Sequence, residues 1–181
     1  MAKFKFTELV TEGGAFTARL GTAGSANRYT DAEVGKAVKL STDSDFVLAV
    51  AGDKIEGFIR SMEVASLDDF SIGTVQCEDR KSVVLDGLEA TPGTGAIAIG
   101  DYVVVGTVVA KGTALSADCK VTKATNQPFA VVTSSDNVVG NINIALAKMT
   151  DASKNATFAW RLVSASGTAV GSTGVIERVC G

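Results

Sequence analysis

Short runs of β-branched and apolar residues recur along most of the chain, and residues that favour turns separate them. Runs of this kind at regular spacing are typical of the strands of a β-sandwich or a small barrel. We expect strands at residues 38–40, 46–50, 55–64, 74–77, 82–85, 102–109, 129–133, 142–149, 158–163 and 174–179. No window of helical length keeps an apolar stripe at helical spacing. The pattern therefore predicts an all-β fold, a small β-barrel or sandwich.

The two ends of the chain depart from this pattern. Residues 3–10 alternate loosely and favour an extended arm or a first strand, whereas residues 11–30 are rich in Gly, Ala and Thr and favour a loop. Residues 29–33 favour one short helical turn that Gly35 ends. Residues 164–173 are almost all small, which predicts either a C-terminal hairpin with a long tip or a linker to an edge strand.

These differences suggest a division into three parts. Residues 1–33 form an N-terminal arm and loop, residues 34–150 the barrel or sandwich core, and residues 151–181 the C-terminal strands. Residues 51–57 and 99–106 echo one another, since each has Gly-Asp opening an apolar strand that meets another Gly. We attribute the echo to turn chemistry, because Gly adopts positive φ and Asp bonds its own backbone, in preference to a true duplication.

Composition narrows the class of protein. The chain has 181 residues, of which 46% are hydrophobic and 20% charged, so it is long enough for one domain and too apolar to be disordered. The net charge is -3 and no basic stripe occurs, which argues against direct binding of nucleic acid. No segment has the length and composition of a signal peptide or a bilayer span, so we expect no membrane association.

The residues that usually carry chemistry are sparse. The chain has no histidine, which removes the commonest general base and metal ligand. Cys77, Cys119 and Cys180 are far apart in sequence, and we expect three free thiols in a protein made in a reducing cytoplasm. Asp43 and Asp45 lack the rest of a calcium loop, and the adjacent Asp68 and Asp69 point in opposite directions in an extended chain and do not converge as an acid/base pair, so both pairs fit solvated turns. We expect neither enzymatic activity, nor a cofactor, nor a metal site.

Several of these segments resemble one known family. They are Val-Gly-Lys-Ala-Val-Lys-Leu at 34–40, Phe-Val-Leu-Ala at 46–49, Gly-Asp-Lys-Ile-Glu-Gly-Phe at 52–58, Gly-Thr-Val-Gln-Cys at 73–77 and Ile-Gly-Asp-Tyr at 99–102. Together they resemble the small β-barrel of tailed-phage capsid decoration, or cement, proteins, in which a strand enters with Gly-x-Ala-Val and Gly-Asp turns open later strands. The C-terminal segments 160–163 and 174–179 also resemble endings of phage structural proteins. The resemblance covers roughly residues 34–110 and the tail.

The resemblance implies a role and partners. Such proteins bind the outside of the assembled major capsid shell, often as homotrimers, and stabilise it against the pressure of the internal DNA. It implies a virion protein on the outer capsid surface, made in the host cytoplasm, with the major capsid protein and its own copies as partners. We expect Lys3, Phe4, Lys5 and Phe6 to contact the capsid or a neighbouring subunit, unless Phe4 and Phe6 lie in the chain's own core. Trp160, the only tryptophan, is expected as a core or interface anchor.

Two other classes of function remain open. The chain could be a different virion component, such as a head fibre base or a tail-tube protein, which would assemble into rings or tubes alone. It could also be a carbohydrate-binding β-domain, although such domains usually present several aromatic side chains on one face and this chain has one Trp and two Tyr.

Overall fold

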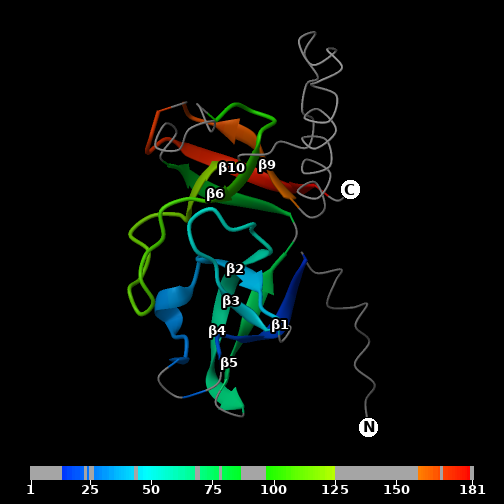
Figure 1. The fold of residues 1–181 in the computed structure, drawn as a ribbon, viewed down its shortest axis with the longest axis vertical. Coiled ribbons are helices and arrows are strands. Elements are labelled where there is room, and N and C mark those ends of the chain that lie inside the picture. The colour runs from blue at the N-terminus through cyan, green and yellow to red at the C-terminus, as the bar shows by residue number, and fades with distance from the viewer. Residues whose placement is uncertain are drawn as a thin grey trace, which may run out of the picture.

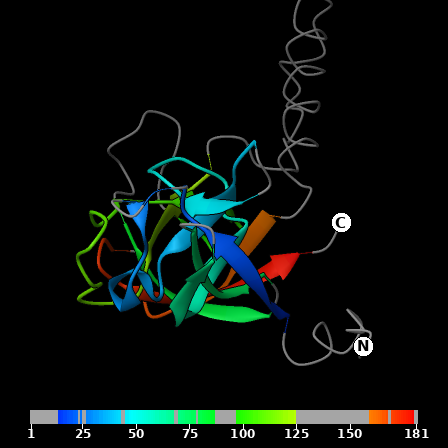
Figure 2. The same ribbon diagram turned by 90° about the horizontal axis from the view of Figure 1, so that it is seen from below.

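The computed structural model describes residues 14–22, 24, 27–42, 45–67, 70–77, 79–86, 97–124, 159–167 and 169–179. Strands dominate this part of the chain, and they close into two five-stranded barrels (Figure 1). The all-β expectation is therefore confirmed. Figure 1 shows the first barrel below the second, and Figure 2 looks at the first barrel from below.

The first barrel comes from the N-terminal half of the described chain. Its strands are β1 (Ala15–Leu20), β2 (Ala37–Leu40), β3 (Phe46–Leu48), β4 (Gly57–Leu67) and β5 (Phe70–Gln76). They close in the order β1-β3-β2-β4-β5, and only the β1–β3 pair is parallel. The interior is filled by one buried side chain from each strand, namely Leu20, Val38, Phe46, Ile59 and Val75.

The second barrel comes from the C-terminal half. Its strands are β6 (Arg80–Leu85), β7 (Tyr102–Val105), β8 (Lys120–Lys123), β9 (Ala159–Ala165) and β10 (Thr173–Val179). Around the barrel they run β6-β8-β7-β9-β10, and only the β6–β8 pair is parallel. Leu85, Val103, Val121, Leu162 and Ile176 again supply one buried interior side chain per strand, and Val83, Val105 and Trp160 add to the same cluster.

The second barrel repeats the first, strand for strand. Replacing β1 to β5 by β6 to β10 reproduces every pairing and its direction. The five interior residues of one barrel take the strand positions of the five in the other. A register shift interrupts β4–β5 after Ile59 and β9–β10 after Leu162. The match in both topology and irregularities shows an internal structural repeat.

Main-chain hydrogen bonds outside the strand ladders repeat as well. Gly35 N–H donates to Ile59 O at 2.8 Å in the first barrel, and Gly100 N–H donates to Leu162 O at 2.7 Å in the second. Both glycines have positive φ, 87° and 98°, which favours glycine at the entry to β2 and β7. In the repeat, the segment before β2 therefore corresponds to the segment before β7.

The Gly-Asp echo noted in the sequence does not follow this repeat. Gly52-Asp53 lies between β3 and β4, whereas Gly100-Asp101 lies before β7. In each turn the aspartate carboxylate accepts a hydrogen bond from the backbone three residues earlier, at 2.7 Å for Asp53 and 2.8 Å for Asp101. Turn chemistry explains the echo, and the duplication that the sequence analysis disfavoured is present in another register.

Several local expectations are confirmed. The helical turn is a 3-10 helix, η2 (Asp31–Glu33), capped by the Thr30 side chain. The C-terminal segments pair as the β9–β10 hairpin. Strands occur near every expected position in the described part of the chain, although β7 ends at Val105, short of the expected residue 109. The strands expected at 129–133 and 142–149, and the arm at 3–10, lie outside the described residues.

Two strands were missed. Residues 15–20, expected within a loop, form β1, which pairs with β5 along its whole length. Its small residues hid the strand, although Leu20 is fully buried and Phe16 and Ala18 pack against the same cluster. Lys120–Lys123 forms β8, whose two lysines masked the buried Val121. The expected division at residues 33 and 150 does not coincide with the two barrels, because β1 belongs to the first and β9–β10 to the second.

The barrels share one continuous core. Phe58 of β4 and Trp160 of β9 are both fully buried, and their rings meet edge to face with centroids 5.3 Å apart. Around this contact the same buried cluster includes Ala37, Ala49 and Ile55 of the first barrel together with the interior of the second. The two barrels therefore pack as a single body.

No helix in the described ranges is long and apolar enough to cross a membrane.

We expect substitution of Trp160 to separate packing from polarity. Its Nε1 is the one buried side-chain nitrogen or oxygen in the described residues that has no hydrogen-bond partner. Trp160→Ala should lower the free energy of unfolding by ~3–5 kcal/mol, because it empties the contact with Phe58. Trp160→Phe should cost clearly less, since it keeps an aromatic ring and removes the unpaired N–H.

Urea unfolding followed by circular dichroism measures both variants against the wild type. Equal losses for Trp160→Phe and Trp160→Ala would contradict the assignment of an unsatisfied indole in the shared core.

Candidate functional site: the seam between the two barrels

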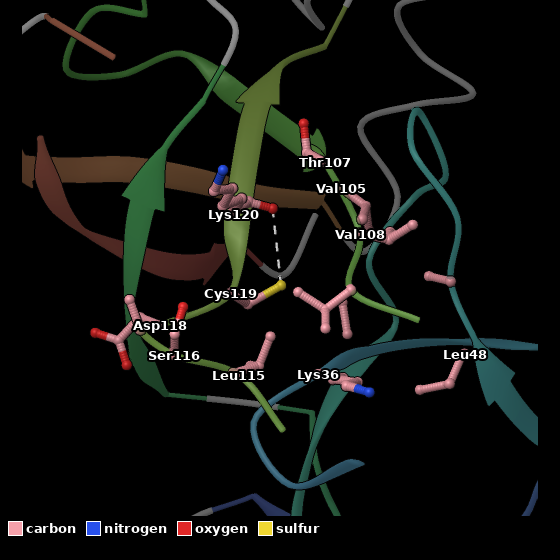
Figure 3. A pocket seen from close by; sticks show the side chains of 14 residues that line it. Lys36, Leu48, Val105, Thr107, Val108, Leu115, Ser116, Asp118, Cys119 and Lys120 are labelled. Carbon is pink, nitrogen blue, oxygen red and sulfur yellow. Dashed lines mark hydrogen bonds between the residues drawn. The ribbon is translucent and has the colours of Figure 1, made fainter. Parts of the chain in front are cut away.

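A cavity of about 60 Å³ lies where the two barrels meet. The first barrel lines it from β2, β3 and their flanking residues, and the second from β7 and the connection 106–119. Figure 3 shows Cys119 and Leu115 of the second barrel on one side and Leu48 of the first on the other. Pockets for drug-sized ligands usually exceed ~300 Å³. The volume therefore fits a packing defect at a junction better than a small-molecule site.

A buried ion pair holds this junction together. Glu33 of η2 and Lys36 have side chains that are 1% and 6% exposed, and Lys36 Nζ lies 3.5 Å from Glu33 Oε1. Lys36 Nζ also donates to Ala110 O at 2.9 Å, and Gly112 N–H donates to Glu33 Oε1 at 2.5 Å. Both charges of the first barrel are thus bonded to the backbone of the 106–119 connection in the second.

The surroundings of Glu33 favour its charged form. Burial alone would raise the pKa of the carboxyl group. The backbone N–H groups of Thr30 and Gly112, the Thr30 hydroxyl and the Lys36 ammonium outweigh burial, and the pKa lies below its usual value. Thr30 N–H donates to Glu33 Oε2 at 2.6 Å, which completes a capping box. One carboxylate therefore caps the N-terminus of the helical turn and accepts a hydrogen bond from the second barrel.

Main-chain hydrogen bonds form a second contact across the seam. Gly52 N–H donates to Val105 O at 2.8 Å, and Val105 N–H donates to Asp53 O at 3.0 Å. The turn after β3 thereby extends the sheet of the second barrel beside β7. Val105 is 2% exposed, and its side chain belongs to the buried core cluster.

Arg178 near the end of β10 makes a third contact. Its Nη1 donates to the backbone carbonyls of Glu56 at 2.8 Å and Cys77, and its Nη2 lies 3.9 Å from Glu56 Oε2. These carbonyls lie just outside β4 and β5 of the first barrel. A guanidinium presents several donors in a fixed plane, so one side chain can satisfy two strand ends.

Cys119 is the one thiol that lines the cavity. The thiol is buried, and burial raises its pKa above the usual value although neighbouring groups partly oppose the shift. Its sulfur donates weakly to Lys120 O at 3.7 Å (Figure 3). The thiolate is the reactive form, so this environment makes the sulfur a poor nucleophile. Cys77 and Cys119 form no disulfide with each other, and Cys180 lies outside the described residues.

The contact residues expected from the sequence lie elsewhere. Trp160 is fully buried within its own chain, so its ring is a core anchor with no surface left for a partner or a sugar. Lys3, Phe4, Lys5 and Phe6 lie outside the described residues. The described residues contain no cluster of three His, Cys, Asp or Glu that could hold a metal ion.

Sequence reasoning missed Glu33, Lys36 and Arg178. Thr30-x-x-Glu33 is a capping-box pattern and could have identified Glu33 as part of the N-terminal cap of a helical turn. Nothing in the sequence indicates the partners across the seam, because Gly112 is 79 positions from Glu33 and Ala110 is 74 positions from Lys36.

No protein-family model, no curated protein and no solved structure matches the chain. The residues of the seam alone indicate its role, and their ion pair and hydrogen bonds between the barrels are those of a structural junction.

We expect Glu33→Gln to weaken the junction in a pH-dependent way. At neutral pH it should lower the free energy of unfolding by ~3–5 kcal/mol, because Lys36 would be left buried without its counter-charge. The folded-state pKa of Glu33 lies below the ordinary 4.5, so the carboxylate contributes fully above that pH. Its contribution is lost as the pH falls through the lowered pKa, and the two proteins should then converge.

Unfolding curves from pH 7 downwards measure the difference. Glu177→Gln is the matched control, because its partner Arg80 is 67% exposed and this pair should contribute less than ~1 kcal/mol. A pH-independent difference for Glu33→Gln would contradict the assigned role.

Proposed function

We propose that this chain is a bacteriophage capsid decoration protein. It binds the outside of the assembled major capsid shell and stabilises the shell against the pressure of the internal DNA. The observation that carries the proposal is that the segments resembling the decoration family are the ones that shape the two barrels. Gly35 opens β2 with positive φ, Gly52-Asp53 joins the barrels, and Gly100-Asp101 opens β7.

The use of charge supports a structural role. The buried charged residues of the described chain are Glu33, Lys36, Asp45 and Asp86. Arg19 binds both carboxylate oxygens of Asp45 at 2.8 and 3.0 Å, and Asp86 accepts from Thr107 N–H at 2.5 Å. Hydrogen bonds from Thr107, helped by Lys120, hold the pKa of Asp86 below its usual value despite burial. These buried charged groups therefore form bonds within the chain, which make it more rigid.

The exposed apolar side chains support a surface that binds other proteins. Large hydrophobic side chains are exposed at loop and strand ends: Val34, Leu40, Val50, Ile99, Val108 and Val170. A rigid body that presents scattered apolar side chains suits shallow contacts repeated over many equivalent sites. Each contact made only with the assembled shell stabilises that shell by mass action.

We expect the purified protein to co-sediment with expanded heads of its cognate major capsid protein and to remain in solution with unexpanded heads. The physical reason is that a decoration protein recognises the subunit arrangement formed on expansion. Quantitative gel analysis of the pellets measures the number of bound copies per shell. Binding to neither form would remove the proposal.

The N-terminal arm gives a second test. Deletion of residues 2–10 should reduce the amount bound to expanded heads, because an extended arm with aromatic side chains can add a strand to a neighbour's sheet edge. The double variant Phe4→Ser and Phe6→Ser keeps Lys3 and Lys5, and it should reproduce the defect if the aromatic side chains make the contact. Normal decoration by the deletion variant would eliminate this role for the arm.

A further inference from the structure

The connection between β7 and β8 is much longer than the repeat requires. In the first barrel, residues 41–45 alone join the corresponding strands β2 and β3. In the second barrel, residues 106–119 join β7 and β8, and we call this segment the strap. Because a short connection is sufficient to close the first barrel, most of the strap is not needed to close the second.

The base of the strap is closed separately from the rest of it. Gly106 N–H donates to Lys120 O at 2.9 Å. This hydrogen bond corresponds to the one in the short connection, where Ser41 N–H donates to Asp45 O at 2.8 Å. A compact surface loop whose two ends lie close together is an Ω-loop. The remainder of the strap can therefore move away from the seam without breaking the pairing of β7 with β8.

The tip of the strap crosses the seam and is attached to the first barrel. Thr113 N–H donates to Ala110 O at 3.2 Å, and Gly112 has a φ of 80°, so the tip is a turn that the strap forms by itself. Lys36 Nζ donates to Ala110 O at 2.9 Å. Gly112 N–H donates to Glu33 Oε1 at 2.5 Å. Both hydrogen bonds lead to the segment that runs from η2 to β2.

Most of the strap is exposed to solvent. Residues 107–108, 110–114 and 116–118 are all exposed. Leu115 is partly buried against the shared core, and it lies so close to Gly35 that a Cβ atom added there would be 3.2 Å from Leu115 Cδ1. Segments with few buried apolar contacts open locally at a lower free energy than the strands of a core.

The ion pair at the tip also favours local opening. Burial of Glu33 and Lys36 removes both charges from water, and this cost offsets much of their mutual attraction. When the tip lifts, both side chains regain water, which compensates for part of the contacts that are lost. The ion pair therefore holds the strap closed by less than its number of contacts suggests.

We propose that the strap is a lid over the seam cavity, which opens while both barrels stay folded. The Glu33–Lys36 pair holds its tip, and Leu115 seats it against Gly35. Opening exposes the cavity and the thiol of Cys119, which is 7% exposed when the strap is closed (Figure 3). The lid needs no capsid and does not depend on the proposed decoration function.

Thiol labelling under native conditions tests the proposal with the full chain. Iodoacetamide reaches Cys119 when the strap is open, and the tryptic peptide 112–120 reports this thiol separately from Cys77 and Cys180. In the wild type, the labelling rate should stay nearly constant from zero urea to well below the unfolding midpoint, because local opening exposes little surface. A rate that follows global unfolding, measured by circular dichroism, at every urea concentration would overturn the proposal.

Glu33→Gln should raise the labelling rate of Cys119 without urea by about tenfold or more, because Lys36 then lacks its counter-charge until the strap lifts. The increase should persist unchanged at low urea. Glu56→Gln is the matched control, because Glu56 also lies at the seam but faces Arg178 of β10, at 3.9 Å, and should keep the wild-type rate. An unchanged rate in Glu33→Gln, or an equal increase in both variants, would contradict the lid.

Leu115→Ala decides the matter if Glu33→Gln does not fold. It removes the contact with Gly35 at a partly buried position, and it should raise the labelling rate of Cys119 several-fold. Val108→Ala makes a similar truncation at a strap residue that is 45% exposed, and it should change the rate less. A folded Leu115→Ala variant that labels at the wild-type rate would eliminate the proposal.

Discussion

The edge-to-face contact between Phe58 and Trp160 is the interaction on which the two-barrel body depends. The interior of the first barrel holds only one buried residue per strand, which is a small core for an independent unit. Phe58 points outward from the first barrel and meets Trp160 inside the second, so the largest buried side chains of the described chain bridge the two. Because the two barrels bury one shared core, the stability of each barrel depends on the other. The buried Glu33–Lys36 pair and Arg178 then fix the orientation that this apolar contact brings about.

The repeat explains why this contact occurs once. In the register shared by the two barrels, Trp160 corresponds to Gly57 and Phe58 corresponds to Arg161. A Cβ atom at Gly57 would come within 2.6 Å of a Val75 methyl and 2.8 Å of Gln76 O, so the first barrel has no room for a side chain there. The same backbone frame therefore carries glycine and phenylalanine in one copy and tryptophan and arginine in the other. At this contact, therefore, the two barrels are not equivalent although their backbones correspond.

The sequence predicts the strands whose apolar residues are bulky and the helical turn whose cap is local. It predicts less well where a strand's role comes from its partner. β1 consists largely of small residues and is a strand because β5 pairs with it over its whole length. β8 carries lysines around Val121 and is a strand because β6 and β7 enclose it. Lys36, Glu33 and Arg178 are ordinary charged residues in sequence, and only the folded chain brings Ala110, Gly112 and Cys77 to them. The turn chemistry expected from the sequence is confirmed. The repeat was not predicted, because it lies in the strand pairings and not in the residue identities.

The difference between the two barrels also determines which side chains are exposed on the surface. Inside the chain, the first barrel covers the second at the seam, and the charged and polar groups there are bonded to one another. The first barrel has no third barrel to cover its own β2 edge, so Leu40 stays exposed where Val105 is buried. The repeat thus places the same strand end in two environments, one inside the seam beside Gly52 and Asp53 and one at the surface.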